Sequence, residues 1–138
     1  MAGLTQLSEM LSTLSPELDQ AHYVFATVHS GEPLDALNPL FIFREAEGDT
    51  VVLSKTQATV AGFDTGTVFA RITLKVHSSL AAVGLTAAVS AALTDHQIPA
   101  NVVAAYYHDH LFVPADRAHE ALAVLEALSL SAQRDSPA

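Results

Sequence analysis

The segment GTVFARITLKVH, Gly66–His77, decides the fold because its side chains alternate between two environments. Apolar residues occupy the even-numbered positions from 68 to 76, whereas the odd-numbered positions are mostly polar. Successive side chains of a strand point to opposite faces of a sheet. The pattern therefore predicts a strand with one buried face and one polar face, as in an antiparallel sheet that is covered on one side.

The residues after this strand predict a helix, two strands and a second helix. In the first helix, apolar side chains recur at positions 85, 88, 89, 92 and 93, and in the second at 118, 121, 122, 125 and 128. The two strands are ANVVAAYY, Ala100–Tyr107, and HLFVP, His110–Pro114. Each helix has one apolar stripe, so we expect both helices to cover the same face of the sheet.

This order predicts an α+β fold of the ferredoxin-like type, βαββαβ, in which an antiparallel sheet carries helices on one face. No segment after Leu128 has the pattern of the closing strand, so another element must fill its edge position. The last stretch, Ser131–Ala138, is predicted to be a disordered tail.

The first half of the chain has a shorter version of the same order. Leucines at positions 4, 7, 11 and 14 predict a helix that ends before Pro16, and His22–His29 is a predicted strand. Two further strands, at positions 40–46 and 50–53, predict a hairpin with its turn at Gly48-Asp49, and a short helix at 56–61 ends at Gly62. We therefore predict a degenerate N-terminal unit, residues 1–64, and a C-terminal unit, residues 65–130, that lend each other elements.

The composition excludes several classes of protein. Fifteen acidic residues against six basic ones give the 138-residue chain a net charge of -9, which disfavours nucleic acid and anionic membranes as partners. The absence of cysteine excludes disulfides, thiolate catalysis and Cys-type zinc sites. The longest apolar stretch, Leu80–Leu93, is about 14 residues, short of the roughly 20 that span a membrane. The N-terminus lacks the pattern of a signal peptide, and we expect a cytoplasmic protein.

The segment Ile72–Val103 resembles an ACT domain. Gly84-Leu85 stands where that family has a glycine-hydrophobic pair at the start of a helix, and Ile98–Val102 stands at its next strand. YVFATV, REAEGDTVVL, HSSLAAVGLTAAV and NVVAAYYHDHLFVP further resemble a bacterial subfamily of small paired-ACT proteins, related to the ACT modules of cytosolic arginine sensors. The resemblance covers most of the chain from Tyr23 to Pro114.

The resemblance implies a regulatory protein, not an enzyme, that binds a small molecule, most typically an amino acid, between ACT units. It implies no cofactor, a homodimer and a separate effector protein. It also places the ligand at the loop before the helix and at the start of the following strand. The aspartate and proline of the family's usual loop are absent here. The ligand-binding residues that the resemblance assigns to these two segments are Ser78, Ser79, Ala82, Val83, Gly84, Leu85, Asn101 and Val102.

The residues of this loop support two interpretations. Free N–H groups at a helix N-terminus favour a carboxylate, the two serines add hydroxyl groups, and Gly84 allows a ligand to approach closely. Alternatively, a serine caps the helix and Gly84 relieves a packing clash. Asn101 either orients a ligand or satisfies the end of its strand. Glu45 and Glu47, two apart on a predicted strand, either receive a cationic group of the ligand, pair with Arg71 and Lys75, or remain solvated.

The stretch YYHDHLF, Tyr106–Phe112, presents two histidines around an aspartate. In an unbroken strand, His108 and His110 would share a face, with Cα atoms about 6.6 Å apart, and with His77 they would offer three metal ligands. The alternative is a tight turn centred on His108-Asp109, which the order of strands favours. We therefore expect a hairpin here in place of a metal site. A metal-dependent enzyme and an interaction domain without a ligand remain the competing hypotheses.

Overall fold

The structure, a computed structural model, describes residues 2–76 and 82–135, and these form two compact units. Unit 1 comprises Met1–Asp19 and Arg71–Ala138, and unit 2 comprises Gln20–Ala70. The helices are α1 (Ala2–Ser12), α2 (Lys55–Val60), α3 (Leu85–Asp95) and α4 (Ala118–Asp135), with short 3-10 turns η1 (Asp35–Leu37) and η2 (Ala115–Arg117). The strands are β1 (Pro16–Val28), β2 (Phe41–Glu45), β3 (Gly48–Ser54), β4 (Phe69–Leu74), β5 (Asn101–Ala104) and β6 (Asp109–Pro114).

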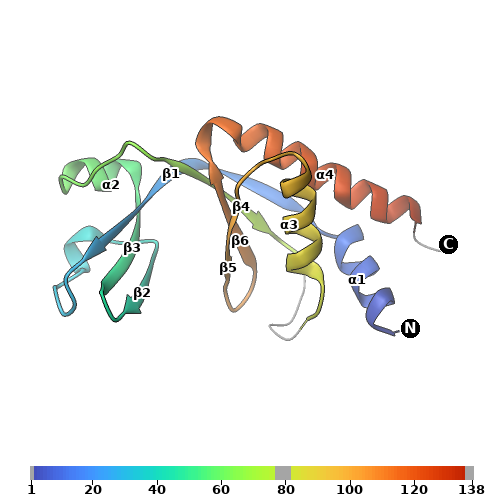
Figure 1. Ribbon diagram of the computed structural model, residues 1–138, viewed down its shortest axis with the longest axis horizontal. Coiled ribbons are helices and arrows are strands. Elements are labelled where there is room, and N and C mark those ends of the chain that lie inside the picture. Colours follow the sequence, from blue (N-terminus) through green and yellow to red (C-terminus); the bar gives the residue numbers. More distant parts are fainter. Residues whose placement is uncertain (1, 77–81, 136–138) are drawn as a thin grey trace. The chain divides into compact units, whose positions relative to one another are not determined.

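Unit 1 has the predicted ferredoxin-like arrangement. Its strands lie in the order β1-β4-β6-β5, and β5 pairs antiparallel with β6. The alternation along β4 is confirmed, because Ala70, Ile72 and Leu74 are buried whereas Arg71 and Thr73 are half-buried. Two helices, α3 and α4, pack against each other as the pattern predicted (Figure 1).

The first residues of β1 fill the edge position that the C-terminal sequence left open. The carbonyl of Ser15 accepts a hydrogen bond from the Lys75 amide at 3.3 Å, directly before the strand begins. Two ion pairs also join β1 to this part of the chain. Arg71 of β4 lies 2.9 Å from Asp19, and Lys75, directly after β4, lies 3.6 Å from Glu17. The strand predicted at His22–His29 therefore starts six residues earlier, at Pro16, and its added residues complete the sheet of unit 1.

The N-terminal helix joins the helices of unit 1. α1 contacts both α3 and α4. The carbonyl of Ser12 accepts hydrogen bonds from the Ser129 hydroxyl at 3.3 Å and from the Gln133 amide at 2.8 Å. These bonds explain why α4 continues to Asp135, beyond the tail predicted from Ser131. Residues 136–138 of that predicted tail lie outside the described residues.

Unit 2 is a smaller, three-stranded version of the same plan. Its strands lie in the order β2-β3-β1, and both neighbouring pairs are antiparallel. Val24, Val51, Leu53 and Ala58 form its core, and side chains from η1, Phe63 and Val68 pack against them. Ser54 caps α2 by accepting the Gln57 amide at 3.1 Å, and Gly62 follows the helix with φ +82°, as predicted for the glycine that ends it.

Both hairpins form where they were predicted, but each turn lies two residues earlier. In the first, Glu45 pairs with Gly48, so Ala46-Glu47 form the turn and the prediction of Gly48-Asp49 was wrong. Gly48 serves a different purpose, because a Cβ atom there would lie 2.7 Å from the carbonyl oxygen of Val28. Glycine at this position therefore suits both the close approach of β1 and a φ of +152° directly after the turn.

In the second hairpin, Ala104 pairs with Asp109, and the turn residues are Tyr106 and Tyr107. The predicted turn at His108-Asp109, with Tyr107 opposite His110, was therefore wrong. Tyr106 and Tyr107 are exposed by 81% and 77%, and their rings contact each other edge-on with centroids 5.0 Å apart. A shift of two residues leaves each side chain on its predicted face, since the repeat of a strand is two residues.

Candidate functional site

The predicted ligand loop ends at a glycine that begins helix α3. Gly84 is the N-cap residue and has φ +98°, a conformation that glycine adopts without strain. Ala82 and Val83 before it are exposed, Val83 by 84%, whereas Leu85 is buried at 3%. Ser78 and Ser79, the two hydroxyl residues predicted for this site, lie outside the described residues.

The start of α3 has backbone amides that are not bonded within the helix. The Gly84 carbonyl accepts the first helical bond, from the Ala88 amide at 2.9 Å, so the amides before Ala88 have no carbonyl partner within the helix. Glycine has no side chain that accepts these N–H groups, and the first turn of the helix contains no acidic residue. These amides and the helix dipole therefore favour a negatively charged group.

Gly84 also has a packing role. A Cβ atom at this position would lie 3.1 Å from Cδ2 of Leu7, which belongs to α1 in the same unit. The packing interpretation of Gly84 is therefore supported by a contact that the sequence did not reveal. Because Leu7 fills the space beside Gly84, a ligand at this loop would use the backbone amides of the first turn of α3.

Asn101 and Val102 begin strand β5 in unit 1. The amide nitrogen of Asn101 lies 3.5 Å from the carbonyl oxygen of Phe112, its partner across the hairpin. That distance is at the limit of a hydrogen bond, so the exposed amide satisfies the strand end only weakly. Val102 is half-buried and pairs with Leu111.

Glu45 and Glu47 lie at the β2–β3 hairpin of unit 2. Glu45 ends strand β2, where its carboxylate accepts a hydrogen bond from the Thr50 hydroxyl. Glu47 lies in the turn, so the expectation that both glutamates share a face of one strand was wrong. The suggested pairing with Arg71 and Lys75 was also wrong, since these cations pair with Asp19 and Glu17 of unit 1.

His110 lies beside β4 in unit 1, where its Nδ1 is 2.9 Å from the hydroxyl oxygen of Thr73. Burial lowers the pKa of His110 from its usual value of 6.5, and the positive charges of Arg71, His108 and Lys75 act in the same direction, whereas Asp109 opposes them. The Nδ1 atom of His108 is buried and has no hydrogen-bond partner within residues 2–76 and 82–135. His77, the third residue of the metal alternative, lies outside those residues.

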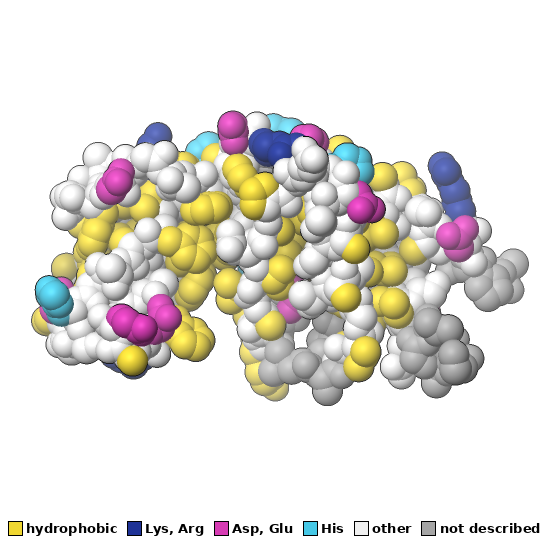
Figure 2. Space-filling model, in the orientation of Figure 1, with side chains coloured by type: hydrophobic (Ala, Val, Ile, Leu, Met, Phe, Trp, Pro, Cys, Tyr) yellow, Lys and Arg dark blue, Asp and Glu magenta, His cyan; other side chains and the backbone are white. Residues whose placement is uncertain are grey.

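The described residues contain no cluster of three or more His, Asp or Glu side chains that fits a metal ion. None of the described helices is both long and apolar enough to cross a bilayer. On the face that Figure 2 shows, Lys and Arg side chains are few and lie apart from one another. This face therefore offers no basic cluster for a polyanion.

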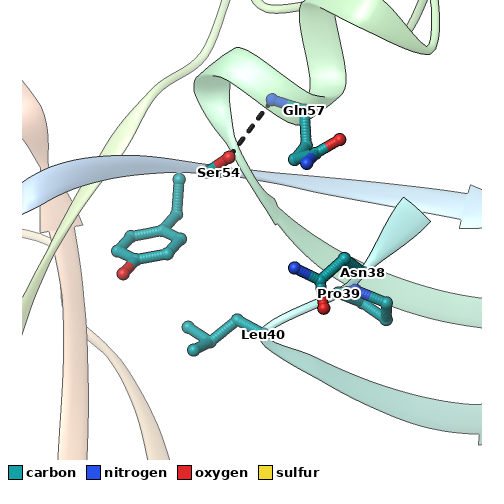
Figure 3. A pocket seen from close by; sticks show the side chains of 6 residues that line it. Asn38, Pro39, Leu40, Ser54 and Gln57 are labelled. Carbon is teal, nitrogen blue, oxygen red and sulfur yellow. Dashed lines mark hydrogen bonds between the residues drawn. The ribbon is translucent and has the colours of Figure 1, made fainter. Parts of the chain in front are cut away.

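A pocket in unit 2 was not predicted. It has a volume of about 350 Å³ and is lined by six residues from β1, from the segment before β2, and from the junction of β3 with α2 (Figure 3). The lining residues are Tyr23, Asn38, Pro39, Leu40, Ser54 and Gln57. In the sequence, Asn38-Pro39 indicates only a loop. The three segments that line the pocket come together only when the strands pair, so no local pattern predicts it.

The comparisons agree with the two-unit fold. A family model described as an ACT domain matches residues 2–70, and a second ACT domain model matches residues 70–127. The search of curated proteins returned no match.

The solved structures that are similar to the chain include the following three. A Vibrio cholerae protein of unknown function, described as a possible transport protein, is 49% identical and superposes with a TM-score of 0.80, over 91% of this chain and 96% of that one. The ligand-free regulatory subunit of aspartate kinase from Thermus thermophilus is 13% identical, with a TM-score of 0.62 over 84% and 97% of the two chains. An Agrobacterium tumefaciens protein is 16% identical, with a TM-score of 0.60 over 83% and 87%.

Proposed function

The chain belongs to the ACT domain family, and from this premise we propose that it is a non-catalytic regulatory protein that binds a small molecule, an amino acid. The observation that carries the proposal is the N-terminus of α3 at Gly84, which has no side-chain cap among the described residues, in the unit with the complete ferredoxin-like sheet. The free amides of the first helical turn bind the carboxylate of the ligand. The fold shared with an aspartate kinase regulatory subunit supports the regulatory role.

In this proposal the loop residues Ser78, Ser79, Ala82 and Val83 surround the carboxylate, and Leu85 contributes its backbone amide. Asn101 and Val102 at the start of β5 contact the remainder of the ligand. Glu45 and Glu47, at the hairpin of unit 2, separately offer carboxylates to a cationic group. A free amino acid carries a carboxylate, which needs hydrogen-bond donors, and an ammonium group, which needs hydrogen-bond acceptors.

Thermal unfolding in the presence of each common amino acid tests the proposal. A ligand that binds only the folded state stabilises it by about 2.7 kcal/mol at 100 times its Kd. We expect one or a few amino acids to raise the Tm with saturation, and their carboxamide derivatives to have no effect because they lack the carboxylate. No increase with any amino acid at millimolar concentration would contradict the proposal.

A pair of matched variants places the ligand within the molecule. Val83 and Val60 are both exposed, by 84% and 80%, but only Val83 precedes α3. We expect Val83→Asp to abolish the increase in Tm, because its carboxylate repels that of the ligand and competes for the same amides. Val60→Asp should bind like the wild type. Equal binding by both variants would move the ligand away from α3.

We also propose that the protein acts as a cytoplasmic homodimer that signals to a separate effector protein. The support for a dimer is the edge strand β2, where Phe43 is exposed by 66% and Ile42 by 40%. Exposed apolar residues on an edge strand favour pairing with another strand. Light scattering after size exclusion should give twice the chain mass, and Phe43→Lys should reduce it to the mass of one chain. Cell fractionation tests the location.

A further inference from the structure

The pocket of unit 2 has an uncharged lining that carries several hydrogen-bonding groups. None of its six lining residues is acidic, basic or histidine. Asn38 and Gln57 each contribute a carboxamide, and Ser54 contributes a hydroxyl group. An ionic ligand would find no opposite charge in this lining. The lining therefore favours a neutral ligand.

The backbone of Asn38 leaves its side chain available. Asn38 has φ +46° and ends η1 with its own amide, which donates to the Asp35 carbonyl at 3.2 Å. The carboxamide is therefore not needed to cap the turn. Among the residues that the structure describes, the side chain of Asn38 has no hydrogen-bond partner, and neither does that of Gln57.

Ser54 adds a directed donor. Its hydroxyl oxygen accepts a hydrogen bond from the backbone N–H of Gln57 at 3.1 Å. The hydrogen of the Ser54 hydroxyl group is therefore able to bond to a ligand. Figure 3 shows this bond and, at the edge of the same pocket, the carboxamides of Asn38 and Gln57 from two separate segments. Each carboxamide offers N–H donors beside a carbonyl acceptor. Each can therefore form two hydrogen bonds with a ligand that has a C=O acceptor beside an N–H donor.

The remaining lining fits a small molecule with an apolar part. Tyr23 is 7% exposed and Leu40 is 38% exposed, and with Pro39 they provide apolar contacts. A volume of about 350 Å³ lies at the lower end of the range for small-molecule sites. The pocket therefore accepts one small ring or side chain, not a nucleotide with its phosphates, which an uncharged lining would not balance.

We propose that this pocket binds a small neutral ligand with an amide-type edge, in which an N–H donor lies beside a C=O acceptor. A pyrimidine base and a primary carboxamide both present this chemistry. The site is distinct in residues and in charge from the carboxylate site proposed at α3, which belongs to unit 1.

Titration of the isotope-labelled full chain with uracil, nicotinamide and benzoate tests this inference by NMR. Uracil represents the base, nicotinamide represents the primary carboxamide, and benzoate is a charged ring without an amide. We expect uracil or nicotinamide to shift the side-chain NH2 resonances of Asn38 and Gln57 saturably, with a Kd of about 1 mM or below. The stronger of the two identifies the source of the ligand. Benzoate should leave these resonances unchanged.

Three variants complete the experiment. Asn38→Gly removes a carboxamide but keeps the left-handed backbone, and Gln57→Leu keeps a similar size without hydrogen bonding. Each should weaken binding by about tenfold or more. Gln6→Ala removes an exposed carboxamide from α1 and should bind like the wild type. The inference fails if neither neutral probe shifts the two resonances, if benzoate shifts them equally, or if all three variants bind alike. Resonances of Gly84 and Leu85 report on the amino acid site separately.

Discussion

Leu7 occupies the space into which a side chain at position 84 would extend. The distance from Cδ2 of Leu7 to a Cβ atom at Gly84 would be 3.1 Å, which is tighter than ordinary van der Waals contact. The two residues are far apart in sequence, yet both belong to unit 1. The N-terminal helix thus packs closely against Gly84, and a larger residue there would have to displace the Leu7 side chain.

Gly84→Ala should destabilise the protein by about 1 to 3 kcal/mol, since alanine is strained at a positive φ and its Cβ would press against Leu7. Chemical denaturation measures this change as a lower midpoint with the same slope. Adding Leu7→Ala should remove the steric part but not the backbone strain, so the two changes should not be additive. Equal stability of Gly84→Ala and the wild type would contradict both the backbone strain and the contact with Leu7.

The stability of the protein should decrease as the pH falls below about 6.5, in part because of His110. Burial, Arg71 and His108 lower the pKa of His110 in the folded state, so the unfolded chain binds a proton more readily. The contribution is present above 6.5 and is lost between 6.5 and the lower pKa of the folded state. Lys75 acts in the same direction and Asp109 opposes it.

His110→Gln should flatten this part of the pH dependence, because glutamine does not titrate and still forms a hydrogen bond with Thr73. Urea unfolding at a series of pH values between about 5 and 8 measures it. His22→Gln changes an exposed histidine and serves as the control. If His110→Gln keeps the slope of the wild type, another group causes the acid sensitivity.

Arg44→Ala should lower the free energy of unfolding by about 1 to 2 kcal/mol through its partner Asp49. The side chain of Asp49 is only 3% exposed, whereas that of Arg44 is 73% exposed, and the two lie 3.2 Å apart. Loss of the arginine leaves a buried carboxylate without its counterion. A double-mutant cycle with Asp49→Asn should give a favourable coupling energy, and a coupling near zero would mean that solvent compensates the charge.

A chain that starts at Thr65 should not fold, although it contains the predicted C-terminal unit. It lacks Pro16–Asp19, which complete the sheet beside β4, and α1, which packs on α4. Circular dichroism should show no cooperative melting. Joining residues 1–20 after Asp135 through a flexible linker should restore a cooperative transition. Cooperative folding of the shorter chain would show that the borrowed strand is dispensable.

The strongest periodic patterns predicted the elements correctly. The alternation around Ile72 identified β4, and the leucines of α3 and α4 identified helices on one side of a sheet, because both signals depend on which side chains can leave water. The inward residues of α4 were predicted less completely. Val124, Ser129 and Ala132 are also buried, the latter two near the part of α4 that bonds to the end of α1, a contact that no local pattern reveals.

Turns and sites were harder to predict because their residues serve distant partners. Gly48 and Asp49 have the chemistry of a turn, yet one accommodates Val28 and the other binds Arg44. The pocket around Asn38 and Gln57 was missed because its three segments are brought together by the pairing of β3 with both β1 and β2. The loop before Gly84 was found through a family resemblance, and its role as a ligand site remains a prediction.

The sequence by itself determined the class of fold, the order of the elements and the face that each strand buries, because these follow from the period of its apolar residues. Only the tertiary structure decided that β1 supplies the fourth strand of unit 1 and that Leu7 packs against Gly84. Both facts arise from contacts between residues more than fifty positions apart along the chain. A local pattern records whether a side chain is buried, but not which distant residue covers it.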